Sequence, residues 1–223
     1  LKELKIHKIK LIEILKTGVP AGFQGMVFSF SNVVIQSSIN AFGAITIAGN
    51  SAAANIEGFI YVSMNAFYQA AISFTSQNFG AKKFERIKKV AFLAESCVFI
   101  IGLSLGTLIA FLGKYPLYLY SSSADVIVAG QKRLLYMGLS FFLCGMMDVM
   151  CGMLRGLGYS ITPMIISMLG ACGFRLLWIF TIFQIPIFHK IEMLYISYPI
   201  SWIITFSAQL ICFVLAYRKI KKD

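Results

Sequence analysis

The chain has 223 residues, of which 58% are hydrophobic and only 13% are charged, and its formal net charge is +11. Its mean hydropathy is +0.79. This composition excludes an ordinary soluble domain and predicts a membrane protein with several spans. The basic residues lie at the ends of apolar runs, which is typical of membrane anchoring and argues against a nucleic-acid partner.

The five cysteines lie within apolar runs, their number is odd and no CxxC pair occurs. We interpret them as packing residues, so neither a disulfide framework nor a zinc site is predicted. Both histidines lie outside the predicted spans, and the chain has no HExxH motif. We therefore expect a protein that is not an enzyme and needs no cofactor.

Residues 1–17 predict a basic, amphipathic lead-in, which is either a helix on the membrane surface or a linker. Residues 18–217 predict a lobe of six spans, and 218–223 a basic tail. The spans are expected at about 19–42, 53–79, 90–112, 134–154, 161–183 and 193–217. The abrupt basic start, without Met or a signal peptide, predicts that the chain continues a longer protein.

The distribution of Lys and Arg predicts the orientation of these spans. With both termini in the cytoplasm, fifteen of the 20 Lys and Arg fall inside and four outside, and Arg175 stays within the membrane. Inside segments of membrane proteins carry such an excess. We therefore expect a multi-pass protein of the cell membrane with both termini cytoplasmic.

The first two spans are unusually polar, with side chains that recur at steps of four residues. These stripes comprise Gln24, Asn32, Gln36 and Asn40 in the first span, and Glu57, Tyr61, Asn65, Gln69, Ser73 and Gln77 in the second. Side chains four residues apart share a face of a helix, and lipid cannot satisfy their polar groups. A single amide is explained well enough by a hydrogen bond between helices. Two matched stripes favour a hydrated cavity, lined by Gln24, Asn32, Gln36, Tyr61, Asn65 and Gln69.

Three charged residues lie deep within predicted spans. At ~1.5 Å per residue, Glu57 and Arg175 each lie roughly a third of the way in from the outer face, so an ion pair between them is one interpretation. Asp148 has no basic partner at its depth. Asp148 is therefore the main candidate to take up a proton or Na⁺, with Glu57 as a second candidate.

Four motifs are spread over most of the chain: GVPAGFQ, AGNSAAANIEGF, QNFGAKKFERIKK and LRGLGYSITPM. Together they resemble the C-terminal half of a multidrug and toxic compound extrusion (MATE) transporter. The resemblance implies an all-α membrane protein, a six-helix bundle that forms one lobe of a twelve-helix transporter. The N-terminal six-helix lobe would then be absent from this chain.

The resemblance also implies a secondary antiporter that works by alternating access within the lipid bilayer. It would export small organic molecules, cationic or amphipathic, in exchange for entering Na⁺ or H⁺. NorM-type members carry a Glu where this chain has Phe28, and an Asp where it has Cys144. Asp148 lies one turn beyond Cys144 on the same face. The cation site is therefore either shifted to Asp148 and Glu57 or located in the other lobe.

Two other functions stay open at this point. The same wider family includes flippases for lipid-linked polysaccharides, which need a strongly cationic cavity, and the only deep cation that the sequence predicts is Arg175. A membrane scaffold without transport is the third alternative. Flux of a fluorescent substrate in vesicles separates it from both transporters.

Overall fold

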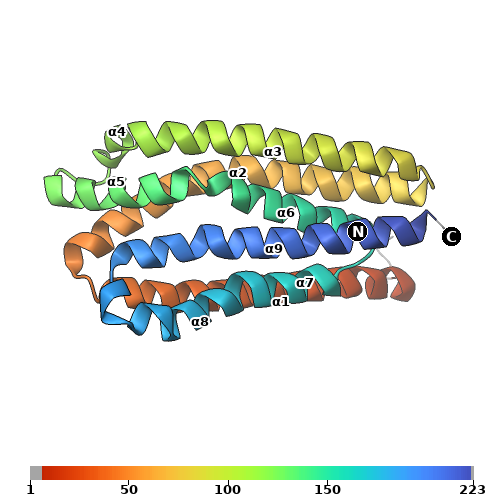
Figure 1. The fold of residues 1–223 in the computed structure, drawn as a ribbon. Coiled ribbons are helices and arrows are strands. Elements are labelled where there is room, and N and C mark those ends of the chain that lie inside the picture. The colour runs from red at the N-terminus through yellow and green to blue at the C-terminus, as the bar shows by residue number, and fades with distance from the viewer. Residues whose placement is uncertain (1–6, 222–223) are drawn as a thin grey trace, which may run out of the picture.

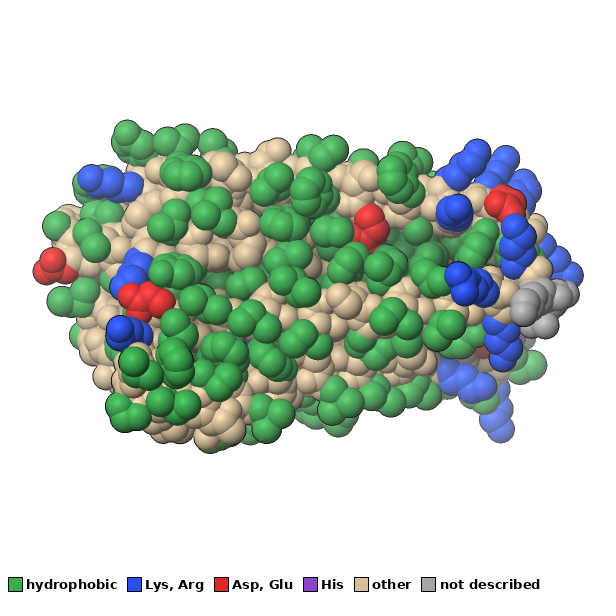
Figure 2. All heavy atoms as spheres, viewed as in Figure 1, with side chains coloured by type: hydrophobic (Ala, Val, Ile, Leu, Met, Phe, Trp, Pro, Cys, Tyr) green, Lys and Arg blue, Asp and Glu red, His purple; other side chains and the backbone are tan. Residues whose placement is uncertain are grey.

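The computed structural model describes residues 7–221, and every regular element within that range is helical. The long helices lie alongside one another in an elongated bundle, and the start of α1 and the end of α9 lie at the same end of it (Figure 1). Parts of the predicted lead-in and tail, residues 1–6 and 222–223, lie outside the described range. Lys and Arg side chains gather at the end of the bundle where α1 starts and α9 ends (Figure 2).

The elements are α1 (Lys8–Asn40), α2 (Ala44–Gly80), α3 (Phe84–Leu112), α4 (Lys114–Leu117), α5 (Ala124–Gly138), α6 (Phe141–Gly156), α7 (Ile161–Ser167), η1 (Met168–Gly173), α8 (Phe174–Phe180), η2 (Ile182–Gln184), η3 (Pro186–Phe188) and α9 (Ile191–Ile220). By length and composition, α1, α3, the segment Ile161–Gln184 and α9 can each cross a membrane. The bent pair of α5 and α6 adds a fifth span if the two count as one. Helix α2 is 37 residues long but carries the polar stripe of the second predicted span.

Helix α1 includes the described part of the predicted lead-in. It runs without interruption from Lys8 through Pro20 to Asn40. Strong helix formers precede the proline, so the helix begins well before the predicted span and Pro20 lies inside it rather than in its first turn. Ile9 and Ile14 are 73% and 66% exposed on this first part of α1.

The fourth predicted span, 134–154, is two helices that meet at an angle of 47°. The break follows Gly138, where α3 and α5 lie so close that a Cβ on Gly106 would come within 2.1 Å of the Gly138 carbonyl oxygen. The Ser140 hydroxyl donates to the carbonyls of Tyr136 and Met137 at 2.9 and 3.1 Å. The Ser140 amide donates to Met137 at 3.1 Å rather than to Tyr136, so the hydroxyl supplies the donor that the Tyr136 carbonyl loses at the break.

The fifth predicted span, 161–183, contains a π-helical segment, η1, between α7 and α8. It packs tightly on α9, because a Cβ on Gly170 would lie 2.4 Å from the Thr205 hydroxyl oxygen. A π-helical turn changes the phase of the side chains that follow it, and such turns occur often at functional sites. Arg175 is the second residue of α8, directly after this segment.

Helix α6 is the centre of the bundle, with 11 of its 16 residues buried. Two of its glycines lie against α2: a Cβ on Gly152 would meet Tyr68 at 3.0 Å, and one on Gly156 would meet Thr75 at 2.6 Å. Small residues let membrane helices approach closely and gain dispersion contacts. The close contact of α2 and α6 forms one wall of the cavity described next.

Candidate functional site

A cavity of about 610 Å³ lies between α1, α2, α5, α6, α8 and α9. On α1 its lining runs from Ala21 to Ile39, which corresponds to about 27 Å along the helix axis. Its volume lies in the range of pockets that hold drug-sized molecules. Most of the first predicted polar stripe and the first three residues of the second face this common space.

The structure brings eight of the nine predicted site residues to the cavity wall. They are Gln24, Asn32, Gln36, Glu57, Tyr61, Asn65, Asp148 and Arg175. The ninth, Gln69, lies outside the lining and is exposed. A strict four-residue stripe turns by about 40° at each step, so it has rotated off the cavity face by this point. The adjacent Tyr68 lines the cavity instead.

Glu57 pairs with Arg133, not with Arg175, which corrects the ion pair considered from the sequence. The Arg133 Nε and Nη2 atoms donate to the two Glu57 carboxylate oxygens at 2.8 and 2.6 Å. Both residues are buried, at 5% and 7% exposure. The sequence had suggested an outer connection for Arg133, but α5 begins at Ala124, so Arg133 lies in its third turn and within the bundle.

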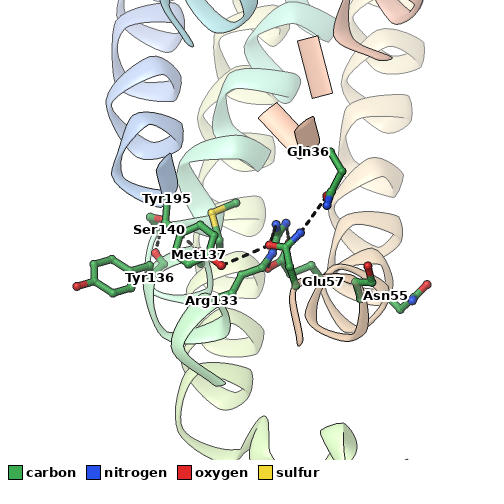
Figure 3. A network of polar contacts seen from close by, with 10 residues as sticks. Gln36, Asn55, Glu57, Arg133, Tyr136, Met137, Ser140 and Tyr195 are labelled. Atoms are coloured by element: carbon green, nitrogen blue, oxygen red, sulfur yellow. Dashed lines mark hydrogen bonds and ion pairs between the residues drawn. The ribbon is translucent and has the colours of Figure 1, made fainter. Parts of the chain in front are cut away.

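The same arginine joins a polar network that links four helices (Figure 3). Its Nη1 atom donates to Asn50 Oδ1 at 2.6 Å, and Asn50 donates to Gln36 Oε1 at 3.1 Å. The Tyr195 hydroxyl donates to Asn50 Oδ1 at 3.4 Å. This network connects α1, α2, α5 and α9 at one end of the cavity, and it satisfies the charges of Glu57 and Arg133.

Arg175 has no carboxylate partner among residues 7–221. Its Nε donates to Ser201 Oγ at 2.8 Å. Its guanidinium carbon lies 4.1 Å from the ring centroid of Tyr198 and 5.6 Å from that of Trp202. The buried Nη2 atom has no hydrogen-bond partner within the described residues.

Asp148 lies on the cavity wall, on α6, and forms no ion pair within the described part of the chain. Tyr61 and Arg155 line the same cavity. Arg155 donates to Gln24 Oε1 at 2.8 Å and also to the Tyr68 hydroxyl, and so ties α6 to α1 and α2. Two turns separate Asp148 from Arg155, so they share a face of α6.

The sequence analysis missed Arg133, Arg155 and Tyr68 as cavity residues. Tyr68 could have been predicted from the rotation of the four-residue stripe around α2. Arg155 could have been predicted from its position seven residues after Asp148, which places both on one face of α6. Arg133 could have been found from the helical spacing of Ile127, Gly130, Leu134 and Met137, whose face it shares and Lys132 does not. No group of three or more His, Cys, Asp or Glu side chains that could hold a metal ion occurs within residues 7–221.

A family model described as MatE matches residues 20–181, more than half of the chain. The probable multidrug resistance protein YoeA of Bacillus subtilis (strain 168) is 24% identical over 204 residues, which are 91% of this chain and 43% of that protein. The probable multidrug resistance protein YpnP of the same organism is 27% identical over 156 residues, 70% of this chain and 35% of that protein.

Among solved structures, the fold is similar to an outward-facing multidrug resistance MATE family transporter of the MOP superfamily. The TM-score is 0.88 at 17% identity, over 100% of this chain and 50% of that chain. The chain therefore spans about half the length, or less, of the relatives that it matches.

Proposed function

The chain belongs to the MatE family of multi-pass membrane transporters, and we propose that it forms one lobe of an antiporter that exports organic compounds. Entry of Na⁺ or H⁺ drives the export by alternating access. A second six-helix lobe completes the transport path, since the chain spans about half the length of its relatives. The basic end of the bundle lies in the cytoplasm, in keeping with the excess of Lys and Arg there.

The single observation that carries this proposal is the position of Asp148. It is an acidic side chain on the wall of a cavity within membrane helices, and no cation forms an ion pair with it among residues 7–221. Ionisable groups within a membrane are costly and typically mark paths for ions or protons. Glu57 is the weaker candidate, because Arg133 already satisfies both of its oxygens.

Coupling works through the contacts of α6 with its neighbours. A proton or Na⁺ at Asp148 neutralises its charge and so weakens its attraction to Arg155, which lies on the same face of α6. Arg155 also holds α1 and α2 through Gln24 and Tyr68. The change in charge therefore shifts the equilibrium between two arrangements of these helices. A ligand that binds one conformation more tightly than the other has the same effect.

The substitution Asp148→Asn tests this mechanism in the protein as the cell makes it, reconstituted in vesicles. We expect export driven by a Na⁺ or H⁺ gradient to fall about tenfold or more, because an amide neither releases a proton nor neutralises Na⁺. The matched control is Asp125→Asn, at an exposed position in the first turn of α5. Unchanged export in the Asp148 variant removes this residue from the mechanism.

A flippase for a lipid-linked polysaccharide is the second candidate, and the charges of the cavity favour it more than the sequence did. Three arginines line the cavity: Arg133, Arg155 and Arg175. Competition between a lipid-linked sugar and a cationic dye separates the two transport functions. A scaffold without transport gives no flux of either compound.

A further inference from the structure

The cavity has one arginine, Arg175, whose terminal nitrogens have no partner among residues 7–221. Arg133 is neutralised by Glu57 through two hydrogen bonds. Arg155 forms no ion pair within residues 7–221, but its two terminal nitrogens donate to Gln24 and to the Tyr68 hydroxyl. Of the three arginines in the lining, Arg175 is the one that, within the described residues, has neither a carboxylate partner nor an acceptor for its terminal nitrogens.

Arg175 is buried at 2% exposure, yet most of its hydrogen-bonding capacity is unused. Of its five N–H donors, only the one on Nε has an acceptor among the described residues, the Ser201 hydroxyl. The buried Nη2 atom has no partner there. Burial of a guanidinium without an acceptor for most of its protons is unfavourable, so the position is explained best by an anion that completes it.

The guanidinium is also held in place before any ligand arrives. Tyr198 lies against it at 4.1 Å, Trp202 lies at 5.6 Å, and Ser201 fixes its Nε edge. The planar fork of arginine matches the two oxygens of a carboxylate, sulfonate or phosphate. A guanidinium held in this way loses little conformational entropy on binding.

The rest of the nearby wall suits an apolar body attached to such an acid group. The apolar lining includes Phe28, Met137, Phe141 and Met147. We propose that Arg175, Ser201 and the rings of Tyr198 and Trp202 form a subsite for the acid group of an amphipathic organic anion. That this anion is a transported substrate rests on the proposed function. Binding of the anion can be tested without transport.

The test uses two probes that differ in charge but hardly in shape, 2-naphthoate and 2-naphthamide, with the protein as the cell makes it in lipid nanodiscs. Calorimetry is expected to show that naphthoate binds about tenfold or more tightly than the amide. Arg175→Gln is expected to remove this difference, and Arg175→Lys, which keeps the charge but loses the planar fork, to reduce it. The control Arg86→Gln, at an exposed arginine, is expected to leave it unchanged.

Two further arms identify the source of the acid group. Displacement of naphthoate by phosphatidic acid in the nanodisc, but not by octyl phosphate, assigns the subsite to a lipid headgroup; displacement by octyl phosphate assigns it to a soluble anion. Three results would each overturn the subsite. They are equal affinities for naphthoate and naphthamide, a preference for naphthoate that survives both Arg175 substitutions, and displacement of naphthoate by neither phosphate.

Asp148→Asn separates this inference from the proposed transport function. This substitution is expected to reduce export driven by the ion gradient about tenfold or more, without weakening the binding of naphthoate. A variant that loses export but still prefers naphthoate supports both proposals, whereas unchanged export with a preserved preference supports the subsite alone.

Discussion

Glu57 of α2 and Arg133 of α5 form a two-bond ion pair, at 2.8 and 2.6 Å, whose partners are 76 residues apart in the chain. Both side chains are almost fully buried, so each charge depends on the other for its stability. The pair joins two helices that the sequence alone does not place next to one another.

Removal of either partner is expected to destabilise the protein strongly. Glu57→Leu or Arg133→Met alone leaves a buried charge unpaired and is expected to cost about 3–5 kcal/mol of unfolding free energy. The double variant is expected to recover most of that loss, since it leaves neither charge. Unfolding in detergent by heat or denaturant measures the coupling, and additive effects of the two substitutions would contradict the pairing.

The neighbouring ion pair between Lys132 and Glu192 is the control for that cycle. Its side chains are 43% and 24% exposed, so solvent screens the interaction. Lys132→Met is therefore expected to cost about 1 kcal/mol or less. A loss as large as that of Arg133→Met would show that charge in this region, rather than burial of the pair, determines stability.

Gly106→Ala is expected to disturb the break between α5 and α6. The new Cβ would lie 2.1 Å from the backbone oxygen of Gly138, so α3 and α5 must move apart. Overpacking of this kind costs about 1–3 kcal/mol or more. The control is Gly58→Ala in α2, where no atom lies within 4 Å of the new Cβ. This substitution is expected to stabilise the protein by about 1 kcal/mol or less. Equal melting temperatures for the two variants would contradict the close contact of α3 and α5.

Native cysteines can report whether the cavity contains water. Cys144 and Cys151 line it, whereas Cys172 is buried elsewhere. The test uses two variants, one in which Cys144 is the single cysteine and one in which Cys172 is. A small charged methanethiosulfonate is expected to modify Cys144 at a rate about tenfold or more higher than Cys172, because only a hydrated thiol reacts readily. Labelling followed by mass spectrometry measures the two rates. Equally slow rates would indicate a dry cavity and contradict the hydrated path on which the export proposal depends.

Much of this protein could be predicted from the sequence, because the decisive information is local. The apolar runs predict membrane helices, since lipid leaves the backbone few alternatives to a helix. The four-residue spacing from Gln24 to Gln36, and from Glu57 to Asn65, indicates faces that avoid lipid. The motifs from GVPAGFQ to LRGLGYSITPM identify the family, which the match over residues 20–181 establishes.

Only the tertiary structure decided which charges meet. The partner of Glu57 is Arg133 rather than Arg175, because α5 begins before the predicted span and so carries Arg133 into the bundle beside α2. Helix starts, breaks and rotations depend on contacts such as that between Gly106 and Gly138, which are far apart in sequence. Hydropathy reports how well each segment suits lipid, but the pairing of two buried charges depends on the relative positions of whole helices, and packing determines these.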